Sequence, residues 1–477
     1  MAEHRITVLG GGLAGCEAAW QAAEHGAAVR LLEMRPAIRT PAHQTAHLAE
    51  LVCSNSLKTE SLLDASGLLK AEMRRLGSLI LRCAEAHRVP AGSALAVDRE
   101  SFAIAVTAAV STHPAIELIR AEAPSVPPAR PLIVATGPLT SDKLAADLAE
   151  RFAAFLATGH PTLDAAAAAA TPRHPEPSAS NLLHFYDAIS PIVAADSIDR
   201  EVAFAAARYG KGGADYLNCP LTRAEYLGFR EALLCGEQFP LHDFEAPSYF
   251  EGCLPIEELA ARGEDTLRFG PMRPVGLRDP RTGRRPYAVV QLRWEDQARG
   301  GQPTMYNLVG FQTRLRRGPQ ATALRLIPGL ARAEILRYGS IHRNTFIAAP
   351  ALLFPTLQFR GDPHVLFAGQ LTGVEGYLES AATGLLAGLN ALRLVQGESL
   401  LTPPRTTILG SLLRYLTTAD VRGFQPINAN FGLLPPLPHR VQDREERNRV
   451  LAERAQADFQ AWVAGSLHEG VRGDGFA

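Results

Sequence analysis

A glycine-rich turn directly after a short apolar run constrains this chain more than any other feature. Residues 5–9 read RITVL, a pattern typical of a buried strand, and Gly10, Gly12 and Gly15 follow at the spacing GxGxxG. A helical run with small residues comes next, and a second strand ends at Glu33. This order of strand, glycine turn, helix and strand is typical of a Rossmann-like dinucleotide-binding unit.

Each glycine of the motif has a physical task in such a unit. Gly10 permits the tight turn, Gly12 lets the backbone approach a pyrophosphate, and Gly15 packs the helix against the strand. The free N–H groups of the helix N-terminus attract phosphates. The turn and this N-terminus are completed by Gly11, Leu13 and Ala14.

Glu33 indicates which dinucleotides fit. It lies 23 residues after Gly10, close to the spacing at which a carboxylate binds ribose hydroxyls. A carboxylate there would repel a 2′-phosphate, so this site favours FAD or NAD over NADP.

A second glycine-rich turn favours FAD over NAD. Residues 365–369 (VLFAG) form another buried-strand pattern, and a long apolar helix is expected from about 378 to 395. Flavoproteins with two such motifs often close their site with a late strand and helix, although many carry an acid where this chain has Gln370. An ordinary strand-to-helix turn is the other interpretation. The predicted flavin contacts here are Gly369, Gln370, Gly373 and Gly376.

These patterns predict an α/β fold with a Rossmann-like, glutathione-reductase-like FAD-binding domain and an inserted α+β domain. Residues 190–335 look more irregular and aromatic-rich, with glycine and proline punctuation. Strand patterns of the first kind return after them. We therefore expect residues 1–190 and 336–477 to form the FAD-binding domain and residues 191–335 to form the inserted substrate domain.

Composition excludes several classes of protein. The 48 basic and 49 acidic residues give a formal net charge of −1, so binding through global charge is not indicated. No apolar run approaches the roughly 20 residues of a membrane helix, and no signal peptide is evident. The six cysteines form no Cys-x-x-Cys pair and are too few for a disulfide scaffold. We expect a cytoplasmic protein with reduced thiols and no membrane association.

Cys53 and Cys219 differ from the other cysteines in their surroundings. Most lone cysteines are small buried hydrophobes, the class expected for Cys16, Cys83, Cys235 and Cys253. Cys53 and Cys219 are instead flanked by polar, turn-forming residues. An arginine and a lysine lie shortly before Cys219, and such charges would lower a thiol pKa. Both cysteines are candidate catalytic thiols.

Two further patterns concern metals and phosphates. His43 and His47 have a spacing that binds metals on helices, but Pro41 indicates a loop and no third ligand is evident, so no metal site is predicted.

Residues 311–343 carry seven arginines and one acid. Such a run is either a solvated face or a phosphate-binding one, and its density favours phosphate. The candidate RNA contacts are Arg314, Arg316, Arg317 and Arg343.

Eight stretches spread over most of the chain resemble the folate- and FAD-dependent tRNA (uracil-5-)-methyltransferases, which are related to the glucose-inhibited-division type of tRNA-modifying flavoproteins. Taken together they are highly specific. They are residues 8–19 (VLGGGLAGCEAA), 40–43 (TPAH), 49–57 (AELVCSNSL), 185–193 (FYDAISPIV), 216–220 (YLNCP), 307–313 (NLVGFQT), 342–345 (HRNT) and 373–377 (GVEGY).

The resemblance implies a reaction and a set of cofactors. The one-carbon unit of 5,10-methylenetetrahydrofolate would reach C5 of the T-loop uridine in tRNA by way of reduced FAD, and NADPH or NADH would reduce the flavin. The resemblance matches Cys219 to the nucleophile. A thiolate that adds to C6 of uracil makes C5 nucleophilic, and a base must then remove the C5 proton. Cys53 matches a second catalytic cysteine near the flavin.

Three other functions stay open at this stage. The first is the longer wobble-uridine-modifying flavoprotein, which has an additional helical C-terminal domain and a GTPase partner. The second is a flavin oxidoreductase of small molecules, and the third is a non-catalytic FAD-dependent RNA-binding protein. For the methyltransferase we expect tRNA, folate and nicotinamide as partners, and no obligate protein partner.

Overall fold

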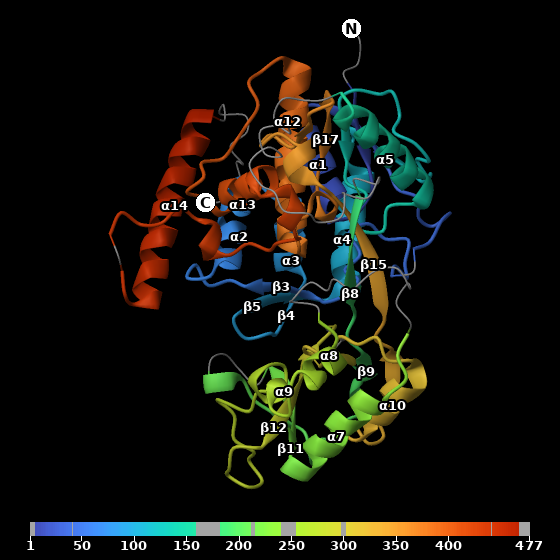
Figure 1. The fold of residues 1–477 in the computed structure, drawn as a ribbon, viewed down its shortest axis with the longest axis vertical. Coiled ribbons are helices and arrows are strands. Elements are labelled where there is room, and N and C mark those ends of the chain that lie inside the picture. Colours follow the sequence, from blue (N-terminus) through green and yellow to red (C-terminus); the bar gives the residue numbers. More distant parts are fainter. Residues whose placement is uncertain are drawn as a thin grey trace.

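The computed structural model contains two parts connected by two long strands (Figure 1). It describes residues 5–40, 42–158, 182–210, 215–239, 254–296, 302–439 and 441–466. The large part comprises residues 5–158 and 348–466, and the small part comprises residues 189–340. Within the described ranges, no helix is long and apolar enough to cross a membrane.

A six-stranded sheet forms the centre of the large part. Its strand order is β16-β17-β7-β1-β2-β6, and all neighbouring strands run parallel except β16 and β17. Strands buried on both faces appear in the sequence as unbroken apolar runs, as β1 and β7 do. The strands are β1 (Arg5–Leu9), β2 (Ala28–Leu32), β6 (Ile116–Ile119), β7 (Leu132–Val134), β16 (Gln358–Phe359) and β17 (Asp362–Phe367).

Helices α1 (Leu13–Glu24) and α12 (Tyr377–Gln396) pack closely because glycines lie at their contact. A Cβ atom added at Gly384 would lie 2.2 Å from the carbonyl oxygen of Ala14, and one at Gly388 would lie 2.4 Å from that of Ala18. Both separations are far below van der Waals contact, so only glycine permits this approach. The packing brings both helix N-termini to the carboxyl end of the sheet.

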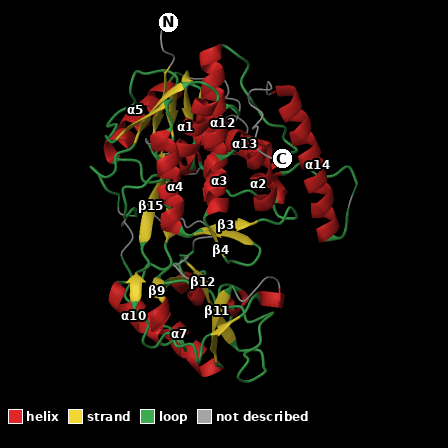
Figure 2. Cartoon of the chain, turned by 180° about the vertical axis from the view of Figure 1, so that it is seen from behind, coloured by secondary structure: helices red, strands yellow, loops and turns green. Residues whose placement is uncertain are grey.

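Further helices surround the large sheet, and a small sheet lies on the side that faces the small part (Figure 2). The small sheet has the order β3-β5-β4 and consists of β3 (Ser56–Thr59), β4 (Arg88–Val89) and β5 (Ala94–Val97). The helices are α2 (Ala65–Arg75), α3 (Leu79–Ala86), α4 (Arg99–Thr112), α5 (Asp142–Leu156), α11 (Ala349–Leu352), α13 (Ile408–Thr418) and α14 (Arg444–Ser466).

The small part is an antiparallel sheet with its own apolar core. The strand order is β10-β11-β12-β13-β9-β14. The strands are β9 (Ile192–Ala194), β10 (Phe204–Ala205), β11 (Tyr216–Leu221), β12 (Ala288–Trp294), β13 (Met305–Leu308) and β14 (Ile335–Arg337). The helices are α7 (Arg223–Cys235), α8 (Ile256–Ala261), α9 (Thr266–Phe269) and α10 (Arg317–Arg325).

Two antiparallel strands, β8 (Leu182–Ala188) and β15 (Ile341–Ile347), connect the parts (Figure 1). The chain therefore enters and leaves the small part through one narrow two-stranded ribbon. The predicted connection at residues 161–180 lies outside the described residues.

The structure confirms the strands expected at residues 5–9, 27–33, 132–137 and 365–369 and the helices expected after each glycine turn. Residues 190–335, which look irregular in the sequence, contain a regular sheet. The central strand β12 is buried along nearly its whole length, including the polar side chains of Gln291 and Arg293, so its polar residues do not mark a solvent-exposed face. The irregular appearance was misleading for that reason.

Candidate functional site

A cavity opens at the carboxyl ends of the parallel strands, the place where α/β sheets bind nucleotides. Its walls come from the ends of β1, β2 and β7, the loop at residues 34–52 and the start of α12. Seven of the residues predicted to bind the cofactor line it: Gly10, Gly12, Leu13, Ala14, Glu33, Gly369 and Gln370. The other four, Gly11, Gly15, Gly373 and Gly376, shape the neighbouring turns.

The three motif glycines face different surroundings. A Cβ atom on Gly15 would lie 1.7 Å from the carbonyl oxygen of Gly10, and one on Gly10 would lie 2.5 Å from the carbonyl oxygen of Ala135. A Cβ atom on Gly12 would meet nothing within 4 Å. Gly10 and Gly15 thus keep strand, turn and helix in contact, whereas the space above Gly12 is open toward the cavity.

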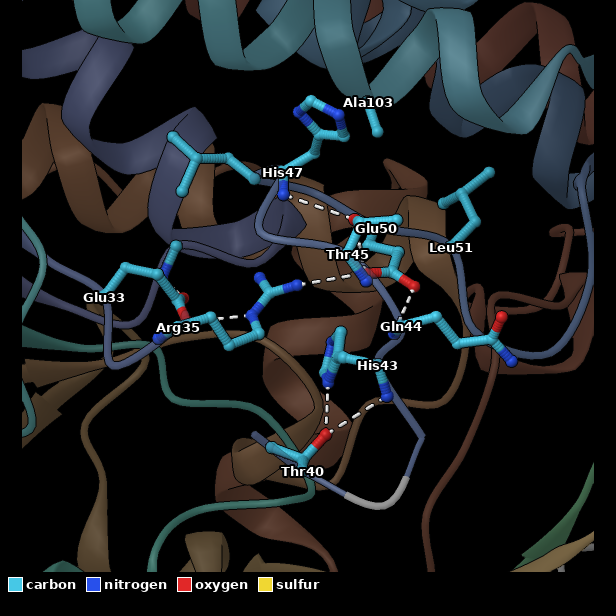
Figure 3. Close-up of polar contacts among 12 residues, drawn as sticks. Glu33, Arg35, Thr40, His43, Gln44, Thr45, His47, Glu50, Leu51 and Ala103 are labelled. Carbon is cyan, nitrogen blue, oxygen red and sulfur yellow. Dashed lines mark hydrogen bonds and ion pairs between the residues drawn. The ribbon is translucent and has the colours of Figure 1, made fainter. Parts of the chain in front are cut away.

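Glu33 is anchored before any ligand arrives (Figure 3). Its carboxylate accepts hydrogen bonds from the backbone N–H of Gly11 at 2.7 Å and from Nε of Arg35 at 2.9 Å. Burial opposes its ionisation, but the charge and hydrogen bonds of Arg35 and the Gly11 N–H outweigh burial and hold the pKa of Glu33 below its usual value. A fixed, ionised carboxylate that borders the cavity suits the binding of ribose hydroxyls.

A second carboxylate, Glu50, organises the loop that covers this side of the cavity (Figure 3). It accepts hydrogen bonds from the backbone N–H groups of Gln44 and Thr45 and forms an ion pair with Arg35 at 3.2 Å. The ring of His43 contacts the Thr40 hydroxyl at 2.5 Å. The residues that the structure describes include no group of three metal-binding side chains that could hold an ion.

The turn between β17 and α12 depends on left-handed backbone conformations. Gly369, Gly373 and Gly376 have φ angles of 77°, 89° and 118°, which side chains with a Cβ disfavour. Gln370, at the cavity wall, donates a hydrogen bond from Nε2 to the Glu375 carboxylate at 2.7 Å. Glycines with these angles allow the chain to turn within a few residues and start α12 beside the cavity.

Cys53 lies next to the cavity, between Val52 and Tyr377, which both line it, and Tyr377 binds Cys53. The Tyr377 hydroxyl oxygen accepts hydrogen bonds from the backbone N–H groups of Cys53 and Ser54, at 2.8 and 3.2 Å, and lies 3.0 Å from the Cys53 sulfur. Burial and the neighbouring thiol raise the pKa of Tyr377 well above its usual value, so the phenol keeps its proton. Tyr377 itself lines the cavity.

The small part holds the other side of the Cys53 loop. Arg293 on β12 donates hydrogen bonds to the Asn55 side-chain oxygen and to the Ser54 hydroxyl, both at 2.9 Å. Asn55 in turn donates to the Trp294 carbonyl at 2.8 Å. The loop that carries Cys53 is therefore clamped between α12 and β12, so it connects the cavity with the small part.

Cys219 lies in a different environment. It is in the middle of β11, fully buried in the core of the small part, and opposite Val290 of β12. The interpretation of its surroundings as turn-forming was wrong, because β11 is a buried strand. Burial raises the pKa of Cys219 to about 12, and the opposing charge of Arg200 does not offset it.

The strand geometry separates the two candidate thiols. Tyr216, at the start of β11, donates a hydrogen bond to the Ala91 carbonyl of the large part. Cys219 is three residues farther along β11, which is about 10 Å at the usual rise of a strand. Cys219 is not among the residues that line the cavity beside the Cys53 loop, so the structure does not bring it to that cavity.

The other cysteines have ordinary surroundings where they are described. Cys16 is buried, contacts the Gly11 carbonyl, and has its pKa raised by burial. Cys83 is buried, and Cys235 is exposed on α7 beside Glu231. Cys253 lies outside the described residues.

The predicted RNA-contacting arginines are not grouped on one free face. Arg314 is mostly buried and pairs with Glu258 at 2.7 Å, and Arg316 pairs with Glu237 at 3.1 Å. The guanidinium of Arg317 lies over the Tyr338 ring. The side chain of Arg343 lies outside the described residues. Their role in binding RNA stays a prediction.

Sequence reasoning missed Arg35, Tyr377 and Arg293. Tyr377 stands in the GVEGY stretch that marked the second turn, so its position beside the flavin motif was the available signal. Arg293 gave no such signal, because its partner Asn55 is 238 residues away in the sequence. Arg35 pairs with Glu33, two residues before it, and with Glu50, 15 residues after it, so only the nearer contact could have been found locally.

The fold and the cavity define an α/β protein with a Rossmann-like FAD-binding type of domain. A solved structure with this fold is GidA from Aquifex aeolicus, with a TM-score of 0.63, 15% sequence identity, and coverage of 98% of this chain and 75% of that one. The family model of glucose inhibited division protein A matches residues 5–399. The chain belongs to that family.

Relatives with high identity carry a more specific name. The chain is 55% identical over 451 residues to methylenetetrahydrofolate--tRNA-(uracil-5-)-methyltransferase TrmFO of Moorella thermoacetica, covering 94% of this chain and 96% of the relative. It is 54% identical over 460 residues to the protein of the same name from Geobacter sulfurreducens, covering 96% and 99%.

Proposed function

We propose that this protein is a methylenetetrahydrofolate- and FAD-dependent methyltransferase that forms 5-methyluridine at the T-loop uridine of tRNA, in the cytoplasm, with NADPH or NADH as reductant. The observation that carries the proposal is the position of Cys53. Its loop borders a dinucleotide cavity on one side and is bound by the small part on the other. The identity to two methyltransferases over nearly the full chain supports the same reaction.

The residues of the cavity fit FAD. The open space above Gly12 and the N-terminus of α1 suit a pyrophosphate, and the anchored carboxylate of Glu33 suits a ribose. Gly369 and Gln370, with the N-terminus of α12, would contact the flavin end. When bound, the flavin supplies the electrons that turn a methylene group into a methyl group.

Tyr377, which lines this cavity, holds the Cys53 backbone N–H and lies beside the Cys53 thiol. The Tyr377 oxygen already accepts two backbone N–H groups, so its own proton is available to the Cys53 sulfur. A phenol that keeps its proton can donate a hydrogen bond to the Cys53 sulfur and so stabilise the thiolate form. This arrangement suits a residue that removes or delivers a proton during the reaction.

Cys219 would act on the RNA. Its thiolate would add to C6 of the uracil, which makes C5 a nucleophile toward the one-carbon unit from the folate. Loss of the C5 proton and elimination of the thiolate would leave a methylene group on C5, and the electrons supplied by the bound flavin would reduce it to methyl. In the structure this thiol is buried and protonated. Catalysis therefore requires tRNA binding to uncover Cys219 and to bring the base and the cavity together.

A reconstitution with purified protein tests the proposal. Transcribed tRNA, methylenetetrahydrofolate, FAD and NADPH are supplied, and nucleosides are analysed by mass spectrometry. We expect 5-methyluridine from native protein and none from Cys53→Ala or Cys219→Ala, each of which retains FAD. Cys83→Ala is the matched control, because that thiol is buried away from the cavity, and it should methylate normally.

Two outcomes would contradict the proposal. If the native protein forms no 5-methyluridine but oxidises NADPH in the absence of RNA, a small-molecule flavin oxidoreductase is supported instead. If either cysteine variant turns over at the native rate, the division of labour between the two thiols is wrong.

A further inference from the structure

One exposed segment of the small part carries unusually dense positive charge. Residues 273–285 contain five arginines and a single acid, Asp279. That acid is itself buried and binds Arg281 through both carboxylate oxygens. Among the described residues no carboxylate pairs with the other four, which are exposed: Arg273, Arg278, Arg284 and Arg285.

Two exposed aromatic rings belong to the same region. Phe269 ends α9 just before the segment and is 82% exposed, and Tyr209 is 59% exposed. The Tyr209 hydroxyl contacts the Arg273 guanidinium at 3.5 Å, and its backbone N–H binds the Gly276 carbonyl. Figure 1 shows α9 and the chain between it and β12 in the lower part of the molecule. Exposed rings beside unpaired arginines are typical of single-stranded RNA contacts, because bases stack on the rings.

A surface pocket begins at this segment and leads toward Cys219. Pro280 and Arg281 form one wall, and residues 200–205, Leu217 and Gln302 form the others, with Glu201 as the one acid. Leu217 and Cys219 are two residues apart on β11, so their side chains lie on the same face of the sheet. The pocket therefore opens on the face of β11 that carries the candidate nucleophile.

Only a thin layer separates the pocket from the thiol. A Cβ atom on Gly329 would lie 3.3 Å from the Cys219 sulfur and 3.5 Å from the Ala203 Cβ. Ala203 thus borders both the pocket and the glycine that contacts the thiol. A small displacement of the 199–203 turn, which rests on Gly329 through an Asp199 N–H hydrogen bond, would join the two.

We propose that residues 273–285 bind the backbone of tRNA and that the pocket between this segment and Arg200 receives the target uridine on its way to Cys219. This inference rests on the proposed function. The guanidinium groups of Arg278, Arg284 and Arg285 neutralise phosphates, and Arg200 at the pocket binds a phosphate that flanks an extruded nucleotide. Loop uridines are recognised in this extruded form because their bases are not locked in a duplex.

This surface differs from the arginine-rich segment that the sequence singles out. Arg314 and Arg316 are engaged by Glu258 and Glu237, so binding RNA there would first cost two ion pairs. Among the described residues, Arg273, Arg278, Arg284 and Arg285 have no such competing carboxylate, whereas Arg281 is paired with Asp279. The structure therefore favours the second segment as the main phosphate contact.

The test compares three triple variants of the full-length holoenzyme. The first is Arg278→Gln, Arg284→Gln and Arg285→Gln, and the second is Arg314→Gln, Arg316→Gln and Arg317→Gln. A control variant removes three exposed arginines of the large part: Arg75, Arg405 and Arg447. The equilibrium constant for tRNA binding is measured at several salt concentrations, and FAD content and thermal stability are checked for each.

The first variant should bind tRNA more weakly, and the slope of log K against log salt should fall by about 0.9 for each lost phosphate contact, up to about 2.7 in all. The control variant should keep the native slope. A native slope in the first variant, or a larger loss in the second, would overturn the proposed surface. If native protein forms no 5-methyluridine, the underlying function fails instead, so the two failures are distinguishable.

A second measurement addresses the pocket. At saturating tRNA that contains 5-fluorouridine, Arg200→Gln should form the covalent enzyme–RNA complex at least tenfold more slowly than native protein, and Arg200→Lys should recover most of the rate. FAD content should be native in both variants. If Arg200→Gln forms the covalent complex at the native rate, the target uridine does not reach Cys219 through this pocket. The same conclusion holds if Arg200→Gln and Arg200→Lys lose the same fraction of the trapping rate.

Discussion

Two glycines three residues apart should respond to substitution in opposite ways. A Cβ atom on Gly15 would lie 1.7 Å from the Gly10 carbonyl oxygen, so Gly15→Ala forces helix and turn apart by about 1.7 Å to reach an ordinary 3.4 Å contact. A side chain on Gly12 enters open space. Its backbone, with φ −76° and ψ −171°, is an extended conformation that valine adopts without strain.

The expected magnitudes follow from these distances. Overpacking usually costs about 1–3 kcal/mol, and Gly15→Ala belongs at or above the upper end because backbone lies on both sides of the clash. That corresponds to a fall in Tm of roughly 6–12 °C. Gly12→Val should cost only about 0.5–1 kcal/mol, the typical effect of an unfavourable residue at a helix N-cap.

FAD affinity should distinguish the variants in the opposite order, with Gly12→Val affected more than Gly15→Ala. The valine methyl groups of Gly12→Val fill the space assigned to the pyrophosphate, so FAD affinity should fall by about a hundred-fold or more, equivalent to roughly 2.8 kcal/mol. The assay is thermal unfolding of flavin-free protein, followed by FAD titration monitored by flavin fluorescence. Gly26→Ala is no suitable control, because Gly26 has a φ of 94°, whereas Gly318→Ala is suitable, because open space surrounds it.

Either of two results would refute the reasoning. Gly12→Val with FAD affinity within about threefold of native would place the pyrophosphate elsewhere. Gly15→Ala with native Tm would show that helix α1 does not depend on the close approach to Gly10.

Three other predictions concern buried polar contacts. Tyr377→Phe leaves the N–H groups of Cys53 and Ser54 without their acceptor, so it should lower the free energy of unfolding by about 1–3 kcal/mol. It should also reduce kcat more than it changes KM, with FAD content unchanged. Tyr415→Phe is the control. Burial raises the pKa of Glu72 to about 8, against the effect of two backbone N–H groups. The contribution of Glu72 to stability is therefore complete below about pH 4.5 and is lost as pH rises to 8. In urea unfolding, the stability of native protein relative to Glu72→Gln should fall over that range. A constant difference between the two proteins would contradict the raised pKa of Glu72. Arg293→Met removes the clamp on the Cys53 loop, so limited proteolysis should cut between the two parts faster than in native protein.

Local patterns in the sequence were sufficient for the nucleotide unit. The order of strand, glycine turn, helix and acid lies within about 30 residues, and each element depends mainly on its own residues and near neighbours. Gly10, Gly12 and Glu33, which this pattern predicts to bind the cofactor, line one cavity. The apolar run at residues 365–369 likewise became a strand of the same sheet, because a parallel sheet buried on both faces needs unbroken apolar strands.

The sequence by itself determined which residues can do chemistry, but only the tertiary structure decided which of them meet. Burial in β11 separated Cys219 from the cavity, and pairing with acids far away in the chain occupied Arg314 and Arg316. Four of the five arginines of residues 273–285 have no carboxylate partner among the described residues, because Asp279, the one acid of the segment, is buried and binds Arg281. Long-range contacts set burial and ion pairing, and a local pattern contains no information about residues that the fold brings from elsewhere.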